Sequence, residues 1–384
     1  MKRGETGRYE VTTVGGETVR AFIPHFLPPV PPIVLNGPLQ NALESAALAL
    51  GRLDGVSTLL PDKSLFLYAY VRKEAVLSSQ IEGTQSSLSD LLLFELNEAP
   101  GAPLNDVVEV SNYVAALDYG LTRLRGGFPL SNRLIREIHG VLLSHGRGSG
   151  KDPGEFRRSQ NWIGGSRPGN AVFVPPPPTA VPDCMSAMEV FLHAENDTLP
   201  ALLRAGLAHV QFETIHPFLD GNGRVGRLLI TFLLCHAGAL REPLLYLSLY
   251  LKQNRLTYYE LLDRTRREGE WEEWLTFFLE GVKQVSDGAV STAERLAELF
   301  RADRSRIESV GRRAGSALRV IEALKARPIQ SMPGVCDLTG LSFPAVSSAM
   351  ELLVELRIVH EHTGKRRNRL FVYDHYLAIL NEGT

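Results

Sequence analysis

One stretch of this 384-residue chain combines residue types that could handle a phosphate. Residues 216–227 read His-Pro-Phe-Leu-Asp-Gly-Asn-Gly-Arg-Val-Gly-Arg. Gly221 and Gly223 permit a tight turn at the start of a helix, where free N–H groups bind anions. Arg224 and Arg227 are three residues apart, so they share one helix face beside the same anion. The spacing therefore predicts a phosphate-binding loop.

Two further residues of the stretch could supply reaction chemistry. Asp220 precedes the turn and would hold Mg²⁺ against phosphates. His216 suits a general base because its ordinary pKa lies near neutrality. A base, a metal ligand and phosphate-binding groups together predict phosphate transfer. The alternative is a structural glycine turn in which His216 and Asp220 cap helices.

A dinucleotide-binding interpretation is excluded. Residues 221–226 match the letters G-x-G-x-x-G, but that motif requires a preceding strand. Here residues 202–215 have the apolar period of a helix instead.

The same twelve residues resemble the signature of the Fic family, H-P-F-x-[D/E]-G-N-G-R-x-x-R, at every signature position. Residues 161–165 and 172–175 resemble the family's target-docking flap. Residues 243–274 resemble its C-terminal helices. The resemblance covers roughly residues 20–285 and implies a mainly α fold, with a Fic-type helical core and a β-hairpin flap.

The resemblance implies a reaction, the transfer of AMP from ATP to a Ser, Thr or Tyr hydroxyl of a target protein. His216 would be the catalytic base and Asp220 the ligand of Mg²⁺. The implied nucleotide-binding residues are Glu82, Gly221, Asn222, Gly223, Arg224, Val225, Gly226, Arg227, Gln253, Asn254, Tyr258 and Tyr259. The implied flap residues are Asn161, Trp162, Ile163, Gly164, Val172, Phe173 and Val174.

A second motif, Ser78-x-x-x-Glu82-Gly83, ends an apolar-periodic helix. Alone it is typical of a solvated glutamate before a capping glycine. Beside the signature it resembles the family's inhibitory motif, whose glutamate pairs with the last signature arginine, here Arg227. We therefore expect autoinhibition through Glu82, because an Arg–carboxylate fork resembles an Arg–phosphate contact.

Periodicity divides the chain into four predicted parts. Residues 1–105 hold a Pro-rich strap at 24–32, whose apolar residues suggest packing on the surface, and the inhibitory helix. Residues 106–285 form the catalytic core, and residues 286–303 form a linker helix. Helical periods are expected at 39–50, 63–77, 107–124, 131–143, 182–194, 199–215, 224–237 and 270–285.

Residues 304–384 form the fourth part, with twelve basic and eight acidic residues. Helices at 314–326 and 342–356, followed by two strands around the basic turn 365–369, predict a winged helix-turn-helix. This part could contact DNA phosphates. A DNA-binding regulator with the Fic core as its nucleotide sensor is therefore one alternative function, and hydrolysis of AMP from modified targets is another.

Composition sets wider bounds. The formal net charge is −2 and 44% of residues are hydrophobic, which excludes a disordered chain. No apolar run approaches the length of a membrane span, so no membrane contact is expected. Three widely spaced cysteines exclude a disulfide framework and favour the cytoplasm. Self-modification and a homodimer are also expected to be possible, and the target protein is not identified by the sequence.

Overall fold

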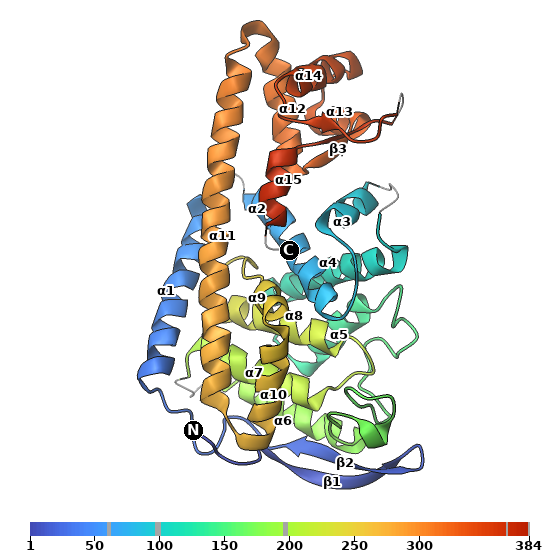
Figure 1. Cartoon of the computed structure of the whole chain (residues 1–384), viewed down its shortest axis with the longest axis vertical. Helices are drawn as coiled ribbons and strands as arrows, with labels where there is room; N and C mark the ends of the chain where they lie inside the picture. The colour runs from blue at the N-terminus through green and yellow to red at the C-terminus, as the bar shows by residue number, and fades with distance from the viewer. Residues whose placement is uncertain (60–62, 97–100, 195–198, 366–367, 383–384) are drawn as a thin grey trace.

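The computed structural model is mainly helical, which confirms the predicted fold class (Figure 1). It describes residues 1–59, 63–96, 101–194, 199–365 and 368–382. Hydrophobic side chains from the whole length of the chain form one large core cluster. None of the described helices is both long enough and apolar enough to cross a lipid bilayer.

Ten helices of the described chain surround the site or lead up to it. They are α1 (Gly37–Leu59), α2 (Lys63–Ile81), α3 (Leu88–Glu95), α4 (Leu104–Arg125), α5 (Asn132–Leu142), α6 (Val181–Leu192), α7 (Ala201–Ile215), α8 (Asn222–His236), α9 (Ser248–Gln253) and α10 (Arg255–Glu268). Short 3₁₀ turns lie at Pro168–Asn170 and Pro178–Ala180. α7 and α8 pack together and carry the two ends of the signature loop.

An N-terminal hairpin, which the sequence analysis did not predict, precedes these helices. Strands β1 (Gly7–Val14) and β2 (Glu17–Pro24) pair antiparallel across a turn at Gly15 and Gly16. The hairpin lies at the end of the molecule near α6 and α10 (Figure 1).

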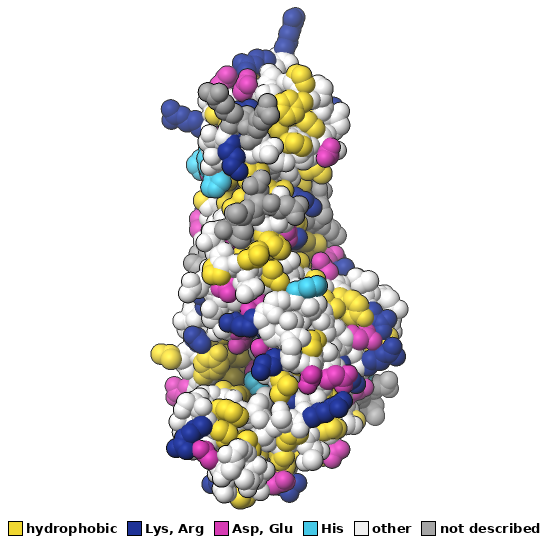
Figure 2. All heavy atoms as spheres, turned by 90° about the vertical axis from the view of Figure 1, so that its right-hand side faces the viewer, with side chains coloured by type: hydrophobic (Ala, Val, Ile, Leu, Met, Phe, Trp, Pro, Cys, Tyr) yellow, Lys and Arg dark blue, Asp and Glu magenta, His cyan; other side chains and the backbone are white. Residues whose placement is uncertain are grey.

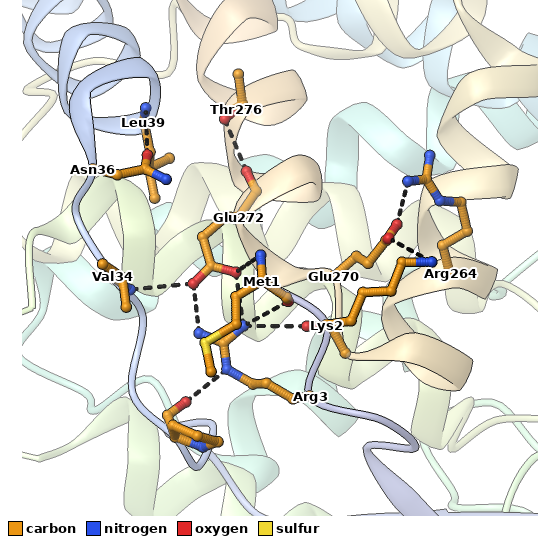
Figure 3. A network of polar contacts seen from close by, with 12 residues as sticks. Met1, Lys2, Arg3, Val34, Asn36, Leu39, Arg264, Glu270, Glu272 and Thr276 are labelled. Atoms are coloured by element: carbon orange, nitrogen blue, oxygen red, sulfur yellow. Dashed lines mark hydrogen bonds and ion pairs between the residues drawn. The ribbon is translucent and has the colours of Figure 1, made fainter.

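The strap at 24–32 is held differently from what we expected. Leu27 packs against the core as expected, but Phe26 and Val30 are exposed. Arg3 is the main anchor, since it donates to the carbonyls of Pro31 and Pro32 and forms a bidentate pair with Glu272, with N–O distances of 2.7 and 2.5 Å (Figure 3). Polar contacts through Arg3 to Glu272, near the start of the helix that begins at Trp271, therefore add to the packing of Leu27.

One long helix, α11 (Trp271–Glu308), runs along much of the molecule and packs against α1 (Figure 1). Residue positions 285 and 303, which the sequence analysis used as boundaries, both lie inside this helix. The boundaries remain predictions.

The C-terminal part is built around a small antiparallel sheet whose strands are, in spatial order, β3 (Ile329–Ser331), β5 (Leu370–Val372) and β4 (His360–Glu361). Its elements are a 3₁₀ turn (Gly311–Arg313), α12 (Ala314–Ala326), β3 (Ile329–Ser331), α13 (Met332–Thr339), α14 (Phe343–Glu355), β4 (His360–Glu361), β5 (Leu370–Val372) and α15 (Asp374–Asn381). Lys and Arg side chains protrude from this end of the molecule (Figure 2). The winged-helix interpretation of these elements stays a prediction.

Candidate functional site

The signature loop joins the end of α7 to the start of α8. His216 closes α7 with a left-handed backbone, φ 49° and ψ 61°, which a residue with a Cβ adopts only when its surroundings enforce it. Gly221 precedes α8 with φ 76°. The first turn of α8 therefore presents N–H groups that have no acceptor within the helix.

Three buried polar side chains hold this loop in place. Arg157 donates from Nε to the His216 carbonyl at 2.9 Å. The side-chain amide of Asn222 makes two hydrogen bonds to the Phe218 backbone, each of 2.8 Å. Its Oδ1 accepts from the Phe218 N–H, and its Nδ2 donates to the Phe218 carbonyl. His139 stacks on Phe218 and contacts the Asp220 carbonyl through Nε2 at 3.0 Å. The amide of Asn222 is thus engaged with the loop and not free for a phosphate.

The loop faces a cavity of about 430 Å³. Its wall includes His216, the start of α8, the flap and one face of α10. The lining residues are Glu82, Ile163, Gly164, Val172, Phe173, Glu213, His216, Gly223, Arg227, Arg255, Tyr258, Tyr259, Leu262, Asp263 and Arg266. A cavity of this size accommodates a nucleotide-sized ligand.

The predicted inhibitory motif lies at this cavity. Arg227 donates from Nη2 to the Glu82 carboxylate at 2.8 Å and from Nε to the Ser78 hydroxyl at 2.8 Å. A side chain at Gly223 would collide with the same carboxylate. Glu82 thus occupies the place at the start of α8 where an anion would bind.

The other signature arginine has a different partner. Arg224 is buried and donates to the Glu109 carboxylate on α4 at 3.1 Å, and it lies 3.4 Å from Asp220. Arg147 contacts the opposite oxygen of Glu109 at 3.0 Å. Arg224 and Asp220 do not line the cavity that contains His216.

The electrostatics keep His216 neutral. Burial and the nearby Arg157 guanidinium lower the pKa of His216 to about 4, while Glu82 acts in the opposite direction. The ring can therefore accept a proton at neutral pH. Its Nδ1 atom is buried without a hydrogen-bond partner among the described residues.

Two buried glutamates lie near Arg227. Burial raises the pKa of Glu74 and of Glu213 to about 7, although Arg227 lowers both. Glu82 behaves differently: burial alone would raise its pKa, but Arg227 outweighs burial and the pKa is lowered. The Glu82 carboxylate is therefore charged at neutral pH.

The predicted flap is less regular than expected. Its hairpin has a single bridge between Ile163 and Phe173, because glycines and a 3₁₀ turn at Pro168–Asn170 interrupt the strands. Asn161 ties the flap to the loop by donating to the Phe218 carbonyl at 3.0 Å. Trp162 is partly exposed, and Val174 is buried away from the cavity.

The residues predicted on the adenine side divide into two groups. Tyr258 and Tyr259 line the cavity, although Tyr258 is also buried against His209. Gln253 lines a different cavity beside α11, and the Asn254 amide donates to the Tyr250 carbonyl. The structure does not bring Gln253 and Asn254 to His216, because α9 ends there and its last turn faces α11.

The remaining predicted residues support the backbone. Val225 is buried, and Gly226 packs against Phe212 and Glu213. Gly83 has φ 100° and forms the turn that follows α2. These positions shape the loop and the motif without contacting the cavity.

Sequence reasoning missed Glu109, His139, Arg157, Glu213 and Arg266. A signal existed for Glu109, His139 and Glu213, because each is a polar residue inside an apolar-periodic helix. Arg157 and Arg266 gave no comparable signal. Only the packing of distant segments makes them neighbours of His216.

Comparison with protein families agrees with the position of the site. Residues 40–122 match the family described as Fic/DOC family N-terminal, and residues 129–234 match the one described as Fic/DOC family. The chain therefore contains Fic/DOC family domains.

Individual relatives extend this result. Protein adenylyltransferase Fic of Culex quinquefasciatus is 32% identical over 214 residues, which are 54% of this chain and 39% of that protein. The protein of that name from Drosophila melanogaster is 30% identical over 213 residues. The chain thus spans well under half the length of these curated relatives.

A solved structure supports the fold. The Fic family protein from Desulfovibrio desulfuricans G20 matches with a TM-score of 0.59 at 19% identity, covering 89% of this chain and 97% of that chain.

Proposed function

We propose that the chain is a protein adenylyltransferase that moves AMP from ATP to a Ser, Thr or Tyr hydroxyl of a target protein. One observation carries the proposal: His216, Arg227 and the first turn of α8 border one cavity beneath the flap. A hydroxyl base, an arginine and a phosphate-binding helix start are the parts that such a transfer requires.

The transfer exchanges one bond of the α-phosphorus for another. His216 takes the proton of the target hydroxyl while the hydroxyl oxygen bonds to the α-phosphorus. The bond between the α-phosphorus and the oxygen bridging to the β-phosphorus breaks, and pyrophosphate leaves. The negative charge of bound ATP would raise the pKa of His216 from about 4, which improves it as a base.

Asp220 fits the role of a Mg²⁺ ligand. Its side chain is 35% exposed and lies directly before the start of α8. The described residues contain no group of three or more potential metal ligands, but Mg²⁺ commonly takes one carboxylate and completes its shell with substrate phosphates and water. When bound, the ion neutralises charge on the departing pyrophosphate.

We further propose that the structure described here is the inhibited state. The Glu82 carboxylate occupies the anion position beside Gly223 and accepts a hydrogen bond from Nη2 of Arg227. A terminal phosphate of ATP would need the same contacts. ATP would then bind with its α-phosphate out of line with the target hydroxyl, so transfer would be slow.

The chemistry is tested with labelled ATP and the Glu82→Gly chain. We expect mass spectrometry to find AMP adducts on lysate proteins or on the chain itself, with matching release of pyrophosphate. The Glu82→Gly, His216→Ala double variant is the control, and it should still bind ATP but form no adduct. Equal adduct formation by both variants would contradict the role of His216.

One observation favours a hydrolase as a second candidate. Glu82 is close enough to His216 to raise its pKa, so it could orient a water for removal of AMP. A modified target incubated with the unaltered chain distinguishes the two. Loss of AMP that Glu82→Gly abolishes would indicate hydrolysis.

A contact between the C-terminal part and α2 favours a third candidate, a DNA-binding regulator. The C-terminal part contacts the helix that carries Ser78, because Lys73 on α2 donates to the Glu382 carbonyl at 2.7 Å and Arg327 lies over the Tyr68 ring. Binding at residues 304–384 could thus reach the inhibitory motif. Duplex DNA that fails to bind the full chain at low salt would remove this candidate.

A further inference from the structure

A second cavity, of about 470 Å³, lies beside the proposed active site. It shares Val172, Phe173, Asp263 and Arg266 with the cavity that contains His216. Three segments form its wall: the N-terminal hairpin, the flap and α10. The residues from the hairpin are Tyr9, Thr18, Val19 and Arg20.

The hairpin is joined to the flap by several contacts. Phe22 donates its N–H to the Val174 carbonyl at 2.9 Å. Glu17 accepts from the Gly169 N–H at 2.7 Å and pairs with Arg167 at 2.5 Å. Strand β2 therefore lies against the flap. Residues 7–24 lie outside both family matches, which makes the hairpin an addition to the shared domains.

The cavity is basic. Three arginines and one aspartate line it, so its formal charge is positive. Asp263 is already engaged, since it pairs with Arg267 at 3.2 Å and Arg266 at 3.7 Å. Arg20 is exposed over the Tyr9 ring and has no carboxylate partner among the described residues.

Arg266, which lies where the two cavities meet, adds a second indication. Its side chain is nine-tenths buried against the Phe173 ring, at 4.1 Å from the centroid. Its Nε atom is buried with no hydrogen-bond partner among the described residues. A buried guanidinium with an unused donor favours an anionic ligand.

We propose that this cavity is a subsite for an acidic side chain of the target polypeptide, near the hydroxyl that is modified. This inference rests on the proposed function, because it assumes that a protein segment docks along the flap. An extended segment on the flap passes from the His216 cavity into the basic one. Its hydroxyl residue would then face His216 while a Glu or Asp beside it faces Arg20 and Arg266.

The test compares two fluorescein-labelled nonapeptides with a central Thr, one with two Glu on each side and one with Gln at those places. Binding to the full chain is measured by fluorescence anisotropy at low salt. We expect the Glu peptide to bind about fivefold more tightly, the effect of one ion pair. The net charge of −2 disfavours general attraction of an acidic peptide.

Variants of the hairpin localise the effect. Arg20→Glu should remove the preference, and Arg20→Lys should keep most of it. Arg8→Glu is the matched control, because Arg8 is exposed on the same hairpin but does not line the cavity. Equal binding of the two peptides overturns the proposal. A preference that survives Arg20→Glu, or that Arg8→Glu removes equally, also overturns it.

Failure of the proposed function would be visible separately. AMP transfer to both peptides is measured with Glu82→Gly and labelled ATP. Preferential binding of the Glu peptide without any transfer would support the subsite and contradict adenylyl transfer.

Discussion

The two arginines of the signature are held by different regions of the molecule. Arg224 pairs with Glu109, a core residue of α4 whose side chain is 1% exposed. Arg227 pairs with Glu82, which follows α2 and whose side chain is 34% exposed. Both arginines are buried on the same helix, so the difference lies in their partners. Glu109 belongs to the buried core, whereas the Glu82 side chain is partly exposed and lines the cavity.

The two carboxylates also differ in their charge balance. Burial raises the pKa of Glu109, and its two arginines do not fully offset this. For Glu82, Arg227 more than offsets burial, and the pKa is lowered. Because its pKa is lowered, the Glu82 carboxylate stays charged above about pH 4.5 and is protonated only at lower pH. Mild acid would therefore leave its contact with Arg227 in place. If Glu82 inhibits as proposed, a competing ligand rather than mild acid would be needed to displace it.

The largest expected effect concerns the scaffold pair. Glu109→Ala leaves Arg224 buried beside only Asp220, so the free energy of unfolding should fall by about 3–5 kcal/mol. Glu82→Ala, the matched comparison, also removes a carboxylate from a buried arginine, but Arg227 keeps the hydroxyl and carbonyl of Ser78, so the loss should be smaller, about 1–2 kcal/mol. Urea denaturation monitored by circular dichroism measures both. Similar losses of unfolding free energy in the two variants would show that the Arg224–Glu109 and Arg227–Glu82 pairs stabilise the fold equally.

The next effect is the pH dependence of stability that arises from Glu213, a buried neighbour of Arg227. Glu213 has a pKa of about 7 in the folded chain against an ordinary 4.5, so the folded state retains its proton longer. Stability should therefore fall as pH rises from 4.5 to 7. The unaltered chain should lose about 3 kcal/mol of unfolding free energy through Glu213 as the pH rises from 4.5 to 8. Glu213→Gln cannot ionise at this position, so the variant should not show that loss.

Denaturation curves at several pH values test this expectation. Glu74 has a similarly raised pKa, so Glu213→Gln should remove only part of the fall. An identical pH profile for the variant and the unaltered chain would show that Glu213 is ionised like an exposed glutamate.

A smaller effect separates the two contacts that hold Arg227. Ser78→Ala removes the hydroxyl that accepts from Nε of Arg227. Losing this one charged hydrogen bond should raise the rate of AMP transfer about fivefold. Ser79→Ala is the control, because Ser79 is equally buried and its hydroxyl has no partner among the described residues. Equal rates for both variants would place the inhibition on Glu82 alone.

Much of the site could be predicted because its residues are contiguous. The twelve residues from His216 to Arg227 specify a helix end, a glycine turn and a helix start, and each follows from local rules. The helices that carry the loop, α7 and α8, were also predicted to within about two residues, whereas α1 and α11 extend well beyond their predicted ends and the bounds of α3, α9 and α10 were not predicted. The pairing of Glu82 with Arg227 required the resemblance, since the two residues are far apart in the chain.

The rest depends on packing between distant segments. Residues 7–24 form a hairpin against the flap, and here a local signal was overlooked, because Gly15-Gly16 between two β-prone runs is typical of a hairpin. Arg266 and Arg157 become neighbours of His216 only through the docking of α10 and the loop after α5. Gln253 was predicted to bind the nucleotide together with its sequence neighbour Tyr258, but it lines a different cavity.

The most direct test of the account is the initial rate of AMP transfer from α-labelled ATP by the unaltered chain and by Glu82→Gly, at equal protein and ATP concentrations. If Glu82 occupies the place of a phosphate at Arg227, the variant should be faster by about tenfold or more. Equal rates, or a faster unaltered chain, would contradict the inhibitory role of Glu82.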